Sequence, residues 1–291
     1  MFKSSEVLFI DGAVGSELER RGVDLSLPLW SSRALIDAPE VLAAVHRDYL
    51  IAGAEAITTA TFRTHRRSLE KVGLGERAAE LTRQAVEIAR RVRDEERPDA
   101  LVFGSVAPLE DCYRPDLVPD EETCLREHTE WMGHLIEAGV DLILIETMNQ
   151  LGEARAAVEA ARRVAPGKWM ISFCTRRGGL PGVLLSGEEL APLLSQLGDA
   201  RAVGVNCVAA NAMVDQVGLL RRALPETPIL AYGNIGHADS DGNWISSDAI
   251  DPDEYVEYVT SWIEAGASIV GGCCGTTPEH IRVTKEKIRL G

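Results

Sequence analysis

The 291-residue sequence contains no apolar run that approaches the roughly 18 residues a membrane-spanning helix needs. No basic and then apolar leader with a small-residue cleavage site opens it either. Its six cysteines lack the close, regular spacing of a small disulfide-rich secreted module. We therefore expect a soluble, cytoplasmic protein with reduced cysteines and no membrane partner.

Positive charge is also scarce. The chain has 30 Lys and Arg residues against 45 Asp and Glu residues, which gives a net charge of −15. A surface of this sign repels phosphate backbones, so we expect no nucleic acid among the partners. The densest basic run, Arg63 to Arg67, is short, and we interpret it as a solvated loop rather than an anion site.

Apolar, β-branched stretches alternate with amphipathic segments along the whole chain. This alternation is typical of parallel strands joined by helices. Neither a linker nor a low-complexity tract interrupts it, and the length is near the roughly 250 residues of a typical (β/α)8 barrel. We predict a single domain, residues 1–291, folded as a (β/α)8 TIM barrel. The predicted strands are Val7 to Asp11, Ala56 to Thr61, Leu101 to Val106, Asp141 to Thr147, Trp169 to Thr175, Ala202 to Cys207, Pro228 to Asn234 and Ser268 to Cys274.

Helix signals lie between these strands. Glu76 to Glu95 and Glu121 to Ala138 carry apolar residues at helical spacing. Asp251 followed by Pro252 is typical of a helix N-terminus. Three glycines that each precede a strand predict helix C-termini: Gly53, Gly139 and Gly266.

Two adjacent cysteines, Cys273 and Cys274, stand between glycines near the end of the chain. Neighbouring side chains of a strand point to opposite faces, so both sulfurs can reach one ion only if the backbone leaves the strand, which glycine permits. Cys207 ends the sixth predicted strand, and the C-terminal ends of barrel strands share one mouth. We therefore predict that the three thiols meet at that mouth.

Three sulfur ligands favour Zn²⁺, and three protein ligands leave a fourth position open, as in catalytic zinc sites. The alternative is that these cysteines pack as small apolar residues. A vicinal disulfide between Cys273 and Cys274 is disfavoured by geometry and by a reducing compartment.

Four segments together resemble the homocysteine S-methyltransferase family, which is related to betaine–homocysteine methyltransferase and to the homocysteine domain of methionine synthase. They are DGAVGSELERRG from Asp11, IETM around Glu146, GVNC ending at Cys207, and GGCCGTTPEHI from Gly271. The resemblance covers nearly the whole chain. It implies a zinc-dependent barrel that methylates the sulfur of homocysteine to give methionine. It also implies that Cys207, Cys273 and Cys274 bind zinc and that the substrate thiolate takes the fourth position.

An amino acid acceptor also needs its ammonium and carboxylate recognised. Glu146 and Asp11 are the acids best placed for the ammonium, and the family uses matching acids in this way. The small residues that begin with Gly12 and Ala13 can offer backbone N–H groups to the carboxylate at a helix start. We expect Asn234, at the end of the seventh strand, to orient the substrate or to occupy the free metal position.

For the methyl donor, Trp30 resembles an aromatic residue found near the donor in the family, and an aromatic face attracts a methylated cation. Phe62 falls in the corresponding second-strand motif and could line the same pocket. Ordinary packing is the alternative for both residues. Arg63 stands where betaine-using relatives carry a tyrosine, and Thr147 follows Glu146 where they carry another. A cationic Arg63 repels a quaternary ammonium, although it can pair with a donor carboxylate if it points inward. We therefore expect a sulfonium donor, S-methylmethionine or S-adenosylmethionine.

Alternatives remain at this point. Betaine or a separate methyl-corrinoid protein could supply the methyl group, selenocysteine could be the acceptor, and a non-catalytic zinc- or thiol-binding protein would need the same thiols. We interpret Cys174 as a buried barrel residue, Cys112 and Cys124 as incidental, and His128 and His134 as surface residues of one helix.

Overall fold

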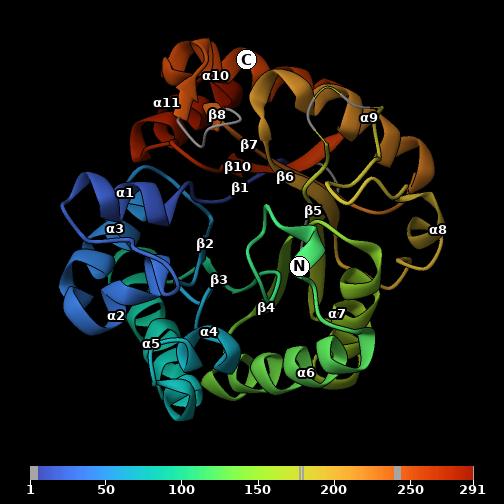
Figure 1. Ribbon diagram of the computed structural model, residues 1–291. Coiled ribbons are helices and arrows are strands. Elements are labelled where there is room, and N and C mark those ends of the chain that lie inside the picture. Colours follow the sequence, from blue (N-terminus) through green and yellow to red (C-terminus); the bar gives the residue numbers. More distant parts are fainter. Residues whose placement is uncertain (1–5, 177, 179, 239–243, 291) are drawn as a thin grey trace.

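Eight parallel strands form one sheet in the computed structural model, which describes residues 6–176, 178, 180–238 and 244–290 (Figure 1). The strand order is β1-β10-β7-β6-β5-β4-β3-β2. A bridge between Ile10 and Ala56 joins the two edges, so the sheet closes into the predicted (β/α)8 barrel. The strands are β1 Leu8–Phe9, β2 Ala56–Thr58, β3 Leu101–Val106, β4 Leu142–Met148, β5 Trp169–Phe173, β6 Val203–Ala209, β7 Ile229–Asn234 and β10 Ala267–Gly272.

Helices surround the barrel (Figure 1). A separate antiparallel pair, β8 Gly236–Ala238 and β9 Trp244–Ser246, lies in the connection after β7. No helix in the described part of the chain is long and apolar enough to cross a membrane. The helices are α1 Val14–Arg20, α2 Ala34–Asp37, α3 Pro39–Ile51, α4 Arg66–Glu70, α5 Ala78–Glu96, α6 Glu121–Ala138, α7 Leu151–Val164, α8 Ala191–Leu194, α9 Met213–Ala223, α10 Pro252–Glu264 and α11 Pro278–Leu290.

Helix termini follow the local signals in the sequence. The Asp251 side chain accepts a hydrogen bond from the backbone N–H of Asp253 at 2.8 Å, and Pro252 occupies the first turn of α10. Gly139 ends α6 with a left-handed φ of +89°. Gly53 and Gly266, just after α3 and α10, have φ values of +104° and +113°, so all three predicted C-terminal glycines are confirmed.

The apolar core has an inner and an outer layer. The barrel interior is filled by side chains such as Phe103, Leu144 and Met170, all fully buried. A larger layer between strands and helices includes Trp131 and Trp262. Burying one such side chain stabilises the fold by about 1.5–3 kcal/mol, so the two layers fix the strands whose ends carry the polar site.

Two expectations about polar side chains are wrong. His128 is fully buried, because α6 packs against α7 as well as the barrel, and its Nε2 lies 3.1 Å from Oε1 of Glu153 on α7. The basic run is not a solvated loop, since Arg63 is 5% exposed. Arg66 and Arg67 form ion pairs at 3.0 and 2.7 Å with glutamates of α6.

Candidate metal and acceptor site

Cys207, Cys273 and Cys274 lie together at the mouth formed by the C-terminal strand ends. Their three sulfur atoms all lie within 4.8 Å of one another, and those of Cys207 and Cys274 are 3.9 Å apart. In the described part of the chain no other group of three or more His, Cys, Asp or Glu residues has this geometry. The predicted meeting of the three thiols is therefore present in the fold.

The backbone leaves the β10 strand where the adjacent cysteines begin. β10 ends at Gly272, where a Cβ atom would lie 2.3 Å from Oγ1 of Thr276, so only glycine fits. Thr276 then closes a turn, because its N–H donates to the carbonyl of Cys273 at 3.0 Å. The turn is also held by β7, because the Cys274 N–H donates to Oδ1 of Asn234, the last residue of that strand, at 3.0 Å. The turn directs both neighbouring sulfurs to one point.

The thiol cluster favours negative charge on one sulfur. Hydrogen bonds from the thiols of Cys174, Cys273 and Cys274 lower the pKa of Cys207 well below its usual value. The same hydrogen bonding to Cys207 is the leading cause that raises the pKa values of Cys273 and Cys274. A partly buried set of three sulfurs fits a soft or borderline divalent cation such as zinc.

Tyr113 belongs to this site although the sequence did not single it out. Its hydroxyl lies 3.3 Å from the sulfur of Cys207. Negative charge on that sulfur raises the pKa of Tyr113, so the phenol keeps its proton and donates. Tyr113 lies in the connection between β3 and α6, beside Cys112, which also lines the cavity.

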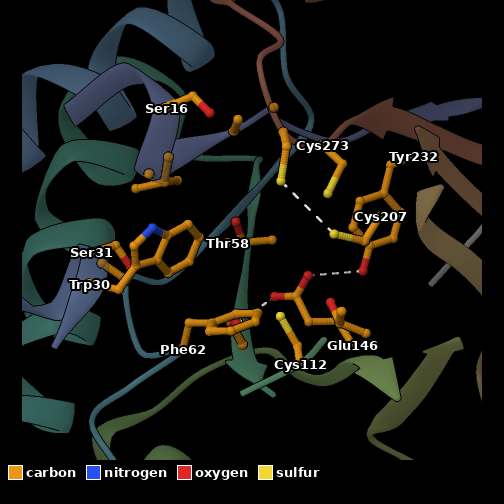
Figure 2. A pocket seen from close by; sticks show the side chains of 18 of the residues that line it. Ser16, Trp30, Ser31, Thr58, Phe62, Cys112, Glu146, Cys207, Tyr232 and Cys273 are labelled. Atoms are coloured by element: carbon orange, nitrogen blue, oxygen red, sulfur yellow. Dashed lines mark hydrogen bonds between the residues drawn. The ribbon is translucent and has the colours of Figure 1, made fainter. Parts of the chain in front are cut away.

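Glu146, at the end of β4, faces the cavity below the sulfurs (Figure 2). Its carboxylate accepts hydrogen bonds from the hydroxyls of Ser105 and of Tyr232, the latter at 3.1 Å. Burial raises the pKa of Glu146 to about 7, although both hydrogen bonds oppose the shift. A cation that binds beside this carboxylate would stabilise its ionised form and offset the cost of burying the charge.

Asp11, just after β1, is the second acid on the cavity wall. It is 2% exposed and accepts a hydrogen bond from the backbone N–H of Thr58 at 2.7 Å. Burial raises its pKa well above the usual value, and the charge of Glu146 contributes to the shift. Two acids that burial holds at raised pKa on one wall are typical of a ligand-binding site.

Small residues at the start of α1 continue this wall. Gly12 and Ala13 line the cavity, and the Ala13 N–H donates to Oγ1 of Thr276 at 3.2 Å. The backbone N–H groups of residues 14–16, in the first turn of α1, lack acceptors within the helix because a helix begins with unpaired donors. The helix start therefore faces the cavity with free donors.

Across the cavity from the sulfur atoms of Cys207 and Cys273, the wall is aromatic (Figure 2). The rings of Trp30 and Phe62 pack edge to face, with centroids 5.1 Å apart. The Trp30 ring also packs against α1, and this contact requires glycine at position 15, since a Cβ atom there would lie 2.5 Å from Cζ2 of Trp30. Arg63 lies beside them, with its Cζ 5.5 Å from the Phe62 ring centroid, and its Nη1 donates to the carbonyl of Glu110 at 2.8 Å.

One cavity of about 420 Å³ joins the sulfur, acid and aromatic walls. It contacts every site residue proposed from the sequence except Asn234, whose amide instead supports the Cys274 backbone. Three non-glycine residues of the described chain have left-handed φ values, and all three line this cavity: Trp30 (+46°), Thr147 (+61°) and Cys207 (+58°). Such backbone strain gathers at functional sites.

The chain resembles known methyltransferases over its whole length. Residues 8–288 match the family model described as homocysteine S-methyltransferase. The homocysteine S-methyltransferase YbgG of Bacillus subtilis is 31% identical, with 95% of this chain and 92% of the relative covered. The selenocysteine methyltransferase of Astragalus bisulcatus is also 31% identical, with 97% and 92% covered.

A solved structure of a homocysteine methyltransferase is also similar to this chain. The metallated form of the homocysteine methyltransferase MmuM from Escherichia coli superposes with a TM-score of 0.84 at 30% identity. The superposition covers 98% of this chain and 97% of that one. With its barrel, thiol cluster and full-length similarity, the chain is an enzyme of the homocysteine S-methyltransferase family.

Proposed function

We propose that this enzyme transfers a methyl group from a sulfonium donor to the sulfur of homocysteine, which yields methionine, with zinc as its cofactor. S-methylmethionine and S-adenosylmethionine are the donors we favour. The observation that carries the proposal is the single cavity in which three clustered thiols and two buried acids face an aromatic wall.

The acids and the helix start suit the polar groups of an amino acid acceptor. An ammonium between Glu146 and Asp11 would relieve the cost of burying two carboxylates, and this relief is largest where the pKa values are raised. The amides at the start of α1 favour a carboxylate. The acceptor would then lie with its sulfur toward Cys207.

The cysteine cluster suits the third functional group of the acceptor, its thiol. Cys207, Cys273 and Cys274 would hold the zinc ion, and three protein ligands would leave a fourth coordination position for the substrate sulfur in the cavity that they line. Bound zinc supplies a lower pKa for a substrate thiol, which keeps that thiol deprotonated at neutral pH. Asn234 contributes by holding the backbone of Cys274.

The aromatic wall suits a positively charged donor. Trp30 and Phe62 would attract a sulfonium through their ring faces and align its methyl group with the acceptor sulfur. The sulfur lone pair forms a bond to the methyl carbon as the bond from that carbon to the sulfonium sulfur breaks. The leaving thioether is neutral, so no general acid is needed, and Arg63 would pair with the donor carboxylate.

The test is methionine formation and zinc content measured on one reduced preparation. Homocysteine is combined in parallel with S-methylmethionine, S-adenosylmethionine, betaine or a methyl-corrinoid protein. One zinc ion per chain and turnover with a sulfonium donor are expected. Turnover only with betaine or the corrinoid protein would overturn the donor assignment. A protein that takes up no zinc after anaerobic reconstitution would overturn the metal assignment.

A further inference from the structure

The side-chain amide of Asn206 connects the acid wall of the cavity to the thiol cluster. Asn206 precedes Cys207 on β6, and Thr147 follows Glu146 on β4. Oδ1 of Asn206 accepts the Thr147 N–H at 2.9 Å, and its Nδ2 donates to the Thr147 hydroxyl at 2.8 Å. A backbone N–H can only donate, so the oxygen end of the amide must face the Thr147 N–H, and the nitrogen end then faces the Thr147 hydroxyl.

Strand β5, which lies between β4 and β6, also takes part in this hydrogen-bond network. Ser172 on β5 donates its hydroxyl to the same Oδ1 atom at 2.7 Å. Asn206 is fully buried, and all of these partners are buried too. Asn206 thus makes three hydrogen bonds that span β4, β5 and β6, and losing one would leave a buried polar group unpaired.

Thr147, which this amide holds, and Cys207, which follows Asn206 in the chain, are both in strained conformations. Thr147 and Cys207 have φ values of +61° and +58°, and each lies where the pairing of its strand shifts register. For a residue with a side chain this conformation is costly and persists only where the surroundings hold it. The register shifts direct the Glu146 carboxylate and the Cys207 sulfur into one cavity.

We propose that Asn206 is a positioning residue that selects the chain length of the acceptor. This inference rests on the proposed function, in which the acceptor ammonium binds at Glu146 and its sulfur at Cys207. The distance between those two points then decides how many methylene groups fit between them. Homocysteine has one methylene group more than cysteine, and a pocket of fixed length discriminates one methylene by about 10- to 200-fold.

Asn206 itself is not among the described residues that line the cavity. Any effect of this amide on acceptor choice must therefore pass through Thr147, to which it is hydrogen-bonded, and through Cys207, its neighbour in the chain. Interactions that orient a metal ligand typically change metal affinity by about 10- to 100-fold, and Asn206 is joined through the main chain to the proposed ligand Cys207. The same amide should thus influence acceptor length and zinc affinity together.

The test compares Thr147→Val, which removes the hydroxyl, with Thr147→Ser, which keeps it. Asn206→Leu removes the whole amide. For each protein, kcat/KM is measured for homocysteine and for cysteine with one donor, and zinc affinity is measured by competition with a chelator. We expect Thr147→Val to lower the homocysteine preference and the zinc affinity each about tenfold, and Thr147→Ser to retain both.

An unchanged preference in a folded Thr147→Val protein would overturn the inference, as would equal losses in Thr147→Ser. If Asn206→Leu does not fold, the Thr147 pair still decides. If the wild-type enzyme methylates no homocysteine, the proposed function fails, and an unaltered zinc affinity in Thr147→Val would then overturn the positioning role independently of activity.

Discussion

The hydroxyl of Tyr113 lies 3.3 Å from the sulfur of Cys207, although 94 positions separate the two residues in the chain. Tyr113 is 52% exposed, and it lines the same cavity as the three cysteines. A hydrogen bond to a charged sulfur is stronger than one between neutral groups, and it would stabilise the thiolate form of a metal ligand.

Removing this hydroxyl should weaken metal binding without affecting the fold. We expect Tyr113→Phe to lower zinc affinity by about two- to tenfold, since a net hydrogen bond is worth about 0.5–1.5 kcal/mol. Chelator competition measures the change. Tyr258→Phe on α10, which loses a 2.9 Å hydrogen bond to Asp248, is the matched control and should bind zinc normally. Equal zinc affinities in both variants would contradict the role of Tyr113.

Cys207→Ala should abolish tight zinc binding and turnover, because two remaining thiols cannot complete the three-sulfur set. Metal analysis of the purified protein and a methionine assay measure the two losses. Cys124→Ala removes a thiol from α6, outside the cavity, and should leave one zinc ion per chain. A Cys207→Ala protein that remains fully active when free of metal would contradict the mechanism.

Glu146→Gln should keep zinc but raise KM for the acceptor by about 10- to 100-fold. The amide can still fill the space between Ser105 and Tyr232, but it carries no charge for the ammonium. Steady-state kinetics with varied homocysteine and saturating donor test this. A variant that loses zinc as well, or that loses only kcat, would indicate a different role for Glu146.

The same carboxylate predicts a dependence on pH. The pKa of Glu146 in the fold is about 7, raised by burial from 4.5, so below pH 7 the free enzyme is mostly protonated there. Because the ammonium needs the ionised form, kcat/KM for homocysteine should rise with pH through about 7, and Glu146→Gln should lack that rise. A wild-type profile that is flat between pH 6 and 8 would disagree with this assignment.

Stability of the metal-free protein should change in the opposite direction. The folded state holds the Glu146 proton more tightly than the unfolded chain, so this group stabilises the fold below about pH 4.5. That stabilisation, about 1–3 kcal/mol, is lost as pH rises through 7. Denaturant unfolding of wild type and Glu146→Gln between pH 5 and 8 isolates the contribution. Parallel curves for the two proteins would show that Glu146 has no raised pKa.

Gly15→Ala should impair donor binding more than acceptor binding. The new methyl group would lie 2.5 Å from Cζ2 of Trp30 and would displace the indole from the aromatic wall. We expect a higher KM for the sulfonium donor and a smaller change in the KM for homocysteine, because alanine keeps the backbone N–H that the acceptor carboxylate would use. Gly133→Ala on α6 meets no atom within 4 Å and should be active and more stable by up to about 1 kcal/mol. Normal donor kinetics in Gly15→Ala would exclude Trp30 from the donor site.

The sequence by itself determined the barrel and the main chemical groups at its mouth. Strand and helix periods depend on near neighbours, and residues that end parallel strands meet at one mouth, so Cys207, Cys273 and Glu146 could be placed from their positions alone. The glycines around the cysteine pair predicted the departure of the backbone from β10. These signals are local, and the fold confirms them.

Tertiary structure decided the partners of those groups. Tyr113 and Tyr232 reach the site from elements that carry no motif, and their contacts exist only after the strands assemble. Burial of His128 depended on packing of α6 against α7, which a helical period does not report. The left-handed φ of Thr147 likewise depends on strand register and on the Asn206 amide, because only long-range hydrogen bonds hold an unfavourable local conformation.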